Sequence, residues 1–278
     1  MNKILEIDYH SKTAPLQFVE SLSNTGFAII KNHTIDQKLI NKTYEDWHAF
    51  FNSEAKHNYL FDYEKQDGYF PFKSENAQGY KTKDLKEFFH IYRWGRYPSE
   101  ISSHTKKIHQ ELLDLGSTFL DWLDIYAPVS VRKNFSLKLS DMITDSGQNL
   151  LRVIHYPPID KKDTVDGSIR AEAHTDINLI TILIAEPGLQ ILNTDGSWSD
   201  VELSKDSIVV NIGDMLQKSS EGFYKSTVHR VVNPNSTKNN ISRYSMPLFI
   251  HPRNEVRLSD SLTAEQYLNQ RLKEIGLK

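Results

Sequence analysis

The chain of 278 residues contains no cysteine. This absence excludes disulfide frameworks, thiolate nucleophiles, zinc sites built with cysteine and cysteine-bound iron–sulfur clusters. Only His, Asp and Glu are left as strong side-chain ligands for a metal ion. The absence also agrees with a reducing compartment, although secreted proteins can lack cysteine too.

The chain also lacks a large excess of one charge and has no long apolar run. The formal net charge of −3 argues against nucleic acid as the main partner, because phosphate binding needs a basic surface. The longest apolar stretch, Leu179 to Ala185, is interrupted by Thr181 and has the length of a strand, far short of a membrane span. Met1 to His10 contains no apolar segment of a signal peptide. We therefore expect a cytoplasmic protein that acts on a small molecule. The sequence does not indicate its oligomeric state.

The pattern of apolar residues changes along the chain near Asn149. Before it, periodicity predicts a strand at 26–31 and helices at 14–23, 35–51 and 108–126. After it, short strands predominate, and a last helix is expected at 263–275. These strands are expected at 150–156, 179–185, 189–193, 207–212, 226–232 and 241–250.

Short strands separated by Gly, Pro and Asn turns indicate a mainly β fold with flanking helices, of the sandwich or barrel kind. We expect residues 148–257 to form the core and residues 1–147 to pack on it and line the substrate pocket. Residues 258–278 are expected to be a C-terminal helix, and the three parts to form one integrated unit.

A possible metal site lies in the β-rich half. His174 and Asp176 are two residues apart, a spacing that places both side chains on one face of a strand. His229 follows in another strand-like run. Two imidazoles and one carboxylate can form a facial triad for iron(II), with three coordination positions left open. Taken alone, a His-x-Asp pair is commonly structural, and zinc could occupy the same three ligands.

With these residues in hand, the second half resembles the isopenicillin N synthase-like group of iron(II)/2-oxoglutarate-dependent oxygenases. The likeness runs from about Leu150 to Pro252 and rests on the order and spacing of several motifs. These motifs are Leu151–Pro158, His174–Asp176, Gly188–Ile191 with Gly196–Trp198, Val210–Gln217, Tyr224–Val231, Arg243–Ser245 and Phe249.

The resemblance implies a double-stranded β-helix, or jelly roll, with iron(II) held by His174, Asp176 and His229. It also implies 2-oxoglutarate and dioxygen as co-substrates, with ascorbate as a reductant in some members. Arg243 and Ser245 would bind the distal carboxylate of 2-oxoglutarate. An arginine suits that role because it is permanently charged and can pair with a carboxylate through two hydrogen bonds.

The resemblance points to roles for four further residues, and the chain departs from the family at the co-substrate end. Tyr156 would add a hydroxyl to the same carboxylate. His90, Tyr92 and Phe249 are candidate residues of the substrate pocket, with core packing as the alternative. Ile154 stands where the family often has an asparagine that helps to position the co-substrate, so that end of 2-oxoglutarate would have one polar contact fewer.

The predicted function is that of an iron(II)- and 2-oxoglutarate-dependent oxygenase that oxidises a small molecule and releases succinate and carbon dioxide. The oxidation could be a hydroxylation, a desaturation or a cyclisation. One alternative is an iron(II) oxidase of the same fold that does not use 2-oxoglutarate, in which Arg243 and Ser245 would hold the substrate's own carboxylate. The other is a cupin-like metal-binding protein without turnover.

Overall fold

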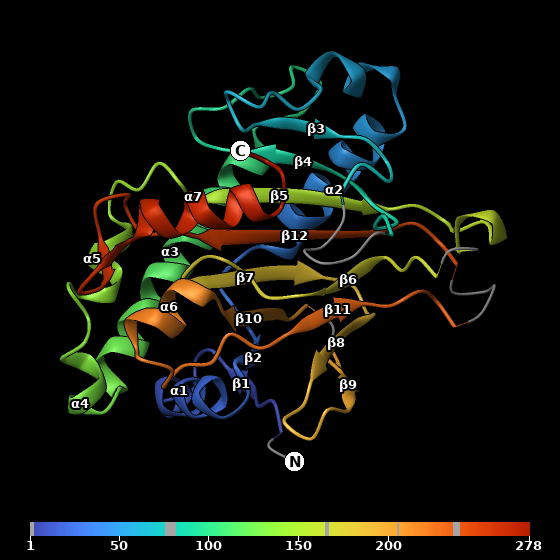
Figure 1. Ribbon diagram of the computed structural model, residues 1–278. Helices are drawn as coiled ribbons and strands as arrows, with labels where there is room; N and C mark the ends of the chain where they lie inside the picture. Colours follow the sequence, from blue (N-terminus) through green and yellow to red (C-terminus); the bar gives the residue numbers. More distant parts are fainter. Residues whose placement is uncertain (1–2, 76–81, 165–166, 205, 236–239) are drawn as a thin grey trace.

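Two β-sheets packed face to face form the centre of the molecule (Figure 1). The computed structural model describes residues 3–75, 82–164, 167–204, 206–235 and 240–278. The larger sheet contains, in spatial order, β1 (Glu6–Asp8), β2 (Phe27–Lys31), β10 (Ile208–Ile212), β7 (Ile180–Ala185), β12 (Arg243–Ile250), β5 (Leu150–Tyr156), β4 (Glu87–Ile91) and β3 (Gly68–Phe70). The smaller sheet contains β6 (Ala171–His174), β11 (His229–Val231), β8 (Leu189–Leu192) and β9 (Trp198–Asp200).

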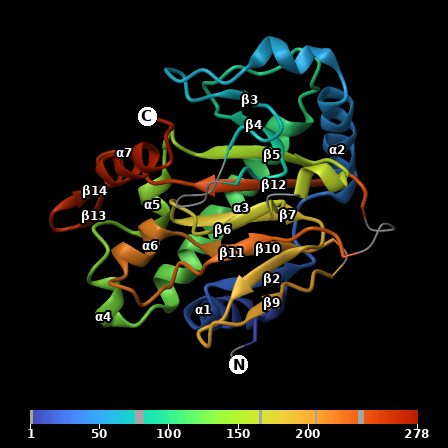
Figure 2. The same ribbon diagram turned by 45° about the vertical axis from the view of Figure 1, so that its right-hand side comes forward.

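Helices cover the outer face of the larger sheet and its ends (Figures 1 and 2). They are α1 (Ala14–Thr25), α2 (Gln37–Phe51), α3 (His104–Tyr126), α4 (Val129–Arg132), α5 (Leu139–Ile143), α6 (Asp214–Ser219) and α7 (Ala264–Glu274). Two short 3-10 helices, η1 (Glu54–Tyr59) and η2 (Lys161–Thr164), and the strand pair β13 (Arg257–Ser259) and β14 (Leu262–Thr263) complete the set.

Alternating side chains of the larger sheet divide the core into two layers. On β10, Val210 packs toward the helices, whereas Val209 faces the smaller sheet. On β5, Val153 belongs to the helical layer, whereas Ile154 and Tyr156 belong to the layer between the sheets. A period of two therefore buries both faces of these central strands, as expected for a sheet that is covered on both sides.

The helical layer is closely packed where α3 crosses the sheet. A Cβ atom on Gly116 would lie 2.0 Å from Cδ1 of Ile250 on β12, so a larger residue would require the end of the Ile250 side chain or the helix to shift. This contact shows why α3 needs a glycine in a helix that is otherwise apolar on one side.

Most of the expected elements are confirmed. A helix or strand occupies each predicted segment, with shifts of a few residues at the ends, and the mainly β class with flanking helices is as predicted. The sequence analysis did not assign β1, β3 and β4, which extend the larger sheet at its two edges. β4 is buried along its whole length yet carries Glu87 and His90, so neither alternation nor apolar content marks it as a strand.

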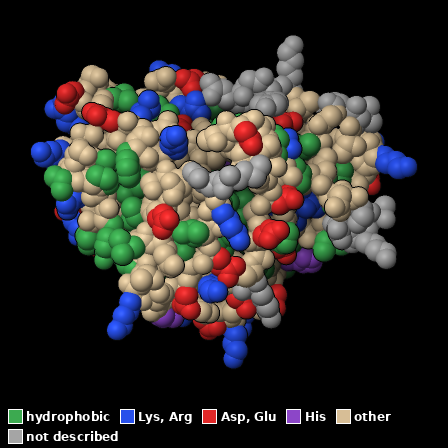
Figure 3. Space-filling model, turned by 90° about the horizontal axis from the view of Figure 1, so that it is seen from below, with side chains coloured by type: hydrophobic (Ala, Val, Ile, Leu, Met, Phe, Trp, Pro, Cys, Tyr) green, Lys and Arg blue, Asp and Glu red, His purple; other side chains and the backbone are tan. Residues whose placement is uncertain are grey.

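The surface carries mixed charges. On the face drawn in Figure 3, acidic and basic side chains are interspersed, and hydrophobic side chains gather in small groups between them. Within the described residues, no helix combines the length and the apolar character needed to cross a membrane. The C-terminus lies beside β3 and β4, and the N-terminus lies toward the opposite end of the molecule (Figure 1).

Candidate metal centre and adjoining cavity

Three potential metal ligands meet at one end of the two sheets. His174 ends β6 and His229 begins β11, and these antiparallel strands place the two residues opposite each other, with ring centroids 4.4 Å apart. Oδ1 of Asp176 lies 4.0 Å from Nε2 of His174 and 3.8 Å from Nε2 of His229. All three ligand atoms lie within 4.8 Å of one another. Atoms about 2.1 Å from a common ion stand about 3 Å apart at right angles, so a contraction of about 1 Å would let the three residues hold a metal.

The strand argument for the first two ligands was wrong in part. β6 ends at His174, and Asp176 lies beyond it, in the connection to β7. The path of this connection and the hydrogen bonds of Asp176 therefore orient its carboxylate toward the two imidazoles. The two-residue period of a strand does not.

Backbone carbonyl groups orient both imidazole rings. Nδ1 of His174 donates to the carbonyl oxygen of Glu172 at 2.6 Å, and Nδ1 of His229 donates to that of Thr227 at 3.1 Å. With the proton on Nδ1, each Nε2 presents its lone pair to the same point. Burial, followed by the charge of His229, lowers the pKa of His174 to about 4. The ring is therefore neutral at neutral pH, which is the form that binds metal.

Two buried polar side chains hold the carboxylate of Asp176. Its Oδ2 accepts hydrogen bonds from Oγ1 of Thr181 at 2.6 Å and from Nδ2 of Asn211 at 2.7 Å. Burial opposes ionisation of Asp176, but His229, His174 and these two donors together keep its pKa below the usual value. The sequence analysis missed both donors. Their signal was a polar residue inside an otherwise apolar strand, on β7 and on β10.

A close backbone contact holds the segment that contains Asp176 and Asn178 in place. The turn between β10 and α6 brings the backbone N–H of Asp214 to the carbonyl oxygen of Asp176, at 2.7 Å. A Cβ atom on Gly213 would lie 2.2 Å from the backbone oxygen of Asn178. Glycine is thus required for this approach, which locks the segment after Asp176 onto the end of the larger sheet.

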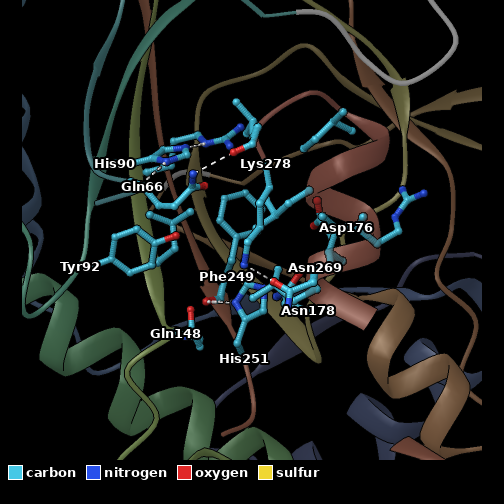
Figure 4. A pocket seen from close by; sticks show the side chains of 18 of the residues that line it. Gln66, His90, Tyr92, Gln148, Asp176, Asn178, Phe249, His251, Asn269 and Lys278 are labelled. Atoms are coloured by element: carbon cyan, nitrogen blue, oxygen red, sulfur yellow. Dashed lines mark hydrogen bonds between the residues drawn. The ribbon is translucent and has the colours of Figure 1, made fainter. Parts of the chain in front are cut away.

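A cavity of about 370 Å³ adjoins two of these ligands, His174 and Asp176. The candidate pocket residues His90, Tyr92 and Phe249 all line it. In Figure 4, Phe249 occupies the middle of the view, with His90 and Tyr92 on one side and Asp176 on the other. The sequence analysis missed several other lining residues, including polar ones on the first-half side and members of α7 and the C-terminal tail. They are Gln66, Glu75, Lys86, Arg152, Leu268, Asn269, Leu272 and Lys278.

The three residues expected at the co-substrate end lie in the layer between the sheets. Arg243 and Tyr156 are opposite each other on β12 and β5, and the guanidinium carbon of Arg243 lies 4.8 Å from the Tyr156 ring centroid. Ser245 is on the same strand as Arg243, two residues later, and both are buried. None of the three is among the residues that line the cavity of about 370 Å³. Among the described residues, the buried Nη1 of Arg243 has no hydrogen-bond partner.

Comparisons with known proteins agree along almost the whole chain. The model of the 2OG-Fe(II) oxygenase superfamily matches residues 147–252, and that of the N-terminal region of non-haem dioxygenases in morphine synthesis matches residues 10–111. The crystal structure of a Shewanella oneidensis protein described as an oxygenase is 44% identical and has a TM-score of 0.89, covering 99% of this chain and 100% of that one. A Caulobacter crescentus protein described as a 2OG-Fe(II) oxygenase family member is 30% identical over 99% of this chain and 100% of that one, with a TM-score of 0.81.

The chain belongs to the 2OG-Fe(II) oxygenase superfamily. Among curated proteins, the 2-oxoglutarate-dependent dioxygenase citB of Monascus ruber is 36% identical over 137 residues. That alignment covers 44% of this chain and 40% of the citB protein, so it spans less than two thirds of that relative's length.

Membership of this superfamily confirms the predicted family, its double-stranded β-helix and the class of enzyme. Iron(II), 2-oxoglutarate and dioxygen are the cofactor and co-substrates of this oxygenase family, as predicted, and the His–Asp–His cluster has the donor set that iron(II) needs. Neither a 2-oxoglutarate-independent oxidase nor a metal-binding protein without turnover is favoured.

Proposed function

We propose that this chain oxidises a small-molecule substrate with iron(II) held by His174, Asp176 and His229. The observation that carries the proposal is the convergence of three ligand atoms within 4.8 Å, two of whose residues, His174 and Asp176, line a cavity of about 370 Å³. A cavity of this size fits a small metabolite. Two imidazoles and one carboxylate bind a divalent ion and leave coordination positions for 2-oxoglutarate and dioxygen.

The charges between the sheets support a place for 2-oxoglutarate. Arg243 and Arg170 both lie near the Tyr156 ring, with guanidinium carbons 4.8 Å and 5.9 Å from its centroid. Among the described residues, neither arginine has a carboxylate within 4 Å, and one buried nitrogen of each has no hydrogen-bond partner. Burial, followed by the charge of Arg243, lowers the pKa of Arg170. Two neighbouring buried cations with no carboxylate within 4 Å among the described residues favour an anionic ligand, which the distal carboxylate of 2-oxoglutarate provides.

The roles of the remaining groups follow from their positions. Nη1 of Arg243 donates to the distal carboxylate, while its Nε and Nη2 stay bound to the carbonyl oxygens of Pro187 and Glu186 at 2.9 and 2.7 Å. The hydroxyls of Ser245 and Tyr156 complete this anchor. When bound, iron(II) supplies the chemistry that couples oxidation of 2-oxoglutarate to succinate and carbon dioxide with oxidation of a substrate C–H bond. The protein orients both molecules and keeps water from the site.

An anaerobic binding experiment tests this assignment. Iron(II) and 2-oxoglutarate added to the apoprotein should produce the visible charge-transfer absorption of the chelate, and the Asp176→Ala variant should not. The Arg243→Met variant should bind 2-oxoglutarate at least about 30-fold more weakly, because loss of one partner of a buried charge pair costs about 2–5 kcal/mol. Arg257→Gln, at an exposed position on β13, is the control and should bind normally.

Two results would contradict the proposal. One is the absence of the absorption from the unmodified protein at saturating 2-oxoglutarate. The other is an Arg243→Met variant that binds 2-oxoglutarate as tightly as the unmodified protein does.

A further inference from the structure

One cationic side chain of the cavity is left with unused hydrogen-bond donors. Arg152, on β5, lines the cavity, and 16% of its side chain is exposed. Its guanidinium carbon lies 4.4 Å from the ring centroid of Phe88 and 5.4 Å from that of Phe249. Among the described residues, its one hydrogen bond runs from Nε to Nε2 of His90, at 3.0 Å. Within the described part of the chain, the two Nη atoms of this partly buried guanidinium therefore make no hydrogen bond and can donate to a ligand.

His90 fixes the direction in which this guanidinium points. Nδ1 of His90 lies 3.3 Å from the backbone carbonyl oxygen of Gln66 and donates to it, which leaves Nε2 as the acceptor for Arg152. Burial, followed by the charge of Arg152, holds the pKa of His90 well below its usual value. A neutral His90 thus occupies Nε of Arg152 and leaves its two Nη atoms to other partners.

The nearby acidic side chains are already engaged by a lysine. Nζ of Lys86 lies 2.8 Å from Oδ2 of Asp84 and 2.9 Å from Oε2 of Glu75. Nη1 of Arg152 lies 3.6 Å from that same oxygen of Glu75, beyond the length of a good hydrogen bond. Lys86 is therefore fully paired, whereas Arg152 has only a long, shared contact with one carboxylate.

The rest of the cavity sets the shape of its ligand. Apolar side chains from β5, β12 and α7 line the same cavity as Arg152 and the candidate ligands His174 and Asp176; they include Leu150, Phe249, Leu268 and Leu272. Phe249 lies between His90, the partner of Arg152, and Asp176 (Figure 4), so a ligand that reaches from Arg152 toward Asp176 passes an apolar side chain. A carboxylate is the group that satisfies two guanidinium donors together.

We propose that Arg152 binds substrate, and that the substrate is a small carboxylic acid whose carboxylate pairs with this guanidinium while its apolar body extends toward His174 and Asp176. This inference rests on the proposed function, because it takes the cavity as the place where the oxidised substrate lies. His90 is then a positioning residue, since it acts on the substrate through Arg152.

Matched acid and amide probes test the charge of the ligand directly. The protein is loaded with Zn(II), which is diamagnetic and does not react with dioxygen, and with saturating 2-oxoglutarate. Dissociation constants are then measured by ligand-observed NMR for three pairs: benzoate and benzamide, phenylacetate and phenylacetamide, and hexanoate and hexanamide. At least one acid should bind the unmodified protein about tenfold or more tightly than its amide, because a charge-assisted pair exceeds a neutral hydrogen bond by about 1.4 kcal/mol or more.

Variants then assign the preference to one residue. Arg152→Gln should bind acid and amide equally, and Arg152→Lys, which keeps the charge but not the planar fork, should retain part of the preference. Arg257→Gln, outside the cavity, should behave like the unmodified protein. The inference is overturned if no acid is preferred by the unmodified protein, or if the preference survives in Arg152→Gln.

The two proposals fail in different ways. Absence of the iron(II)–2-oxoglutarate absorption contradicts the proposed function. A normal absorption combined with no preference for any acid contradicts the assignment of Arg152 alone.

Discussion

Replacing Thr181 with valine removes one of the two hydrogen bonds that hold the carboxylate of Asp176. Oγ1 of Thr181 donates to Oδ2 of Asp176 at 2.6 Å, and Asn211 supplies the other donor at 2.7 Å. Valine keeps the shape of threonine, so the variant loses this bond to a charged group together with two longer contacts between Oγ1 and the side-chain amide of Asn178, at 3.2 and 3.3 Å. Both residues are fully buried on their strands, so water cannot easily replace the missing donor.

The size of the effect follows from the strength of such bonds. A hydrogen bond to a charged group contributes about 1.5–3 kcal/mol, which corresponds to about 10- to 150-fold in a binding constant. Partners that orient metal ligands elsewhere contribute a similar 10- to 100-fold. We therefore expect the Thr181→Val variant to bind a divalent metal about 10- to 100-fold more weakly than the unmodified protein.

Titration of the apoprotein with Co(II), followed by its visible absorption, measures this affinity without oxidation of the metal. Thr43→Val is the matched control: Thr43 is equally buried, and its hydroxyl donates to the carbonyl oxygen of Leu39 within α2. That variant should lose some stability but keep its metal affinity. A Thr181→Val variant that folds normally and binds Co(II) within about threefold of the unmodified protein would refute the reasoning.

Three further predictions concern other contacts. Gly213→Ala should weaken metal binding and lower the free energy of unfolding by about 1–3 kcal/mol, because its Cβ would stand 2.2 Å from the backbone oxygen of Asn178. Co(II) and urea titrations measure the two effects. Gly147→Ala, whose nearest contact would be 3.7 Å, is the control and should show neither. Arg170→Met should weaken 2-oxoglutarate binding about tenfold. It should leave the apoprotein at least as stable as the unmodified protein, since it removes one of two neighbouring buried cations. A lower unfolding free energy in urea titrations would count against this account. Burial lowers the pKa of His109 to about 4, so the unfolded chain binds more protons between about pH 6.5 and 4, and stability falls as the pH falls through that window. Replacing His109 with glutamine should therefore reduce the loss of unfolding free energy between pH 7 and pH 5 by about 2 kcal/mol, and an unchanged loss in urea titrations would contradict it.

Local patterns in the chain were enough to predict much of the fold and the candidate ligands. The strands at 150–156, 180–185 and 208–212 have dense apolar and β-branched residues between turn signals, and these properties depend only on near neighbours in the chain. The types and spacing of His174, Asp176 and His229, together with the motifs around them, pointed to the correct family.

Tertiary structure alone decided which side chains meet across the chain. Thr181 and Asn211 become partners of Asp176 because β7 and β10 pair in one particular register, and no local pattern encodes that register. Arg152 lies beside His90 because β4 pairs with β5 in a register that places these two residues opposite each other. The C-terminal tail reaches the cavity because Nε2 of Gln66 donates to the carbonyl oxygen of Leu277 at 2.8 Å, a contact between residues 211 positions apart. The candidate metal ligands could therefore be recognised from the sequence. Their hydrogen-bond partners and the polar residues that line the cavity could be identified only from the packing of distant segments.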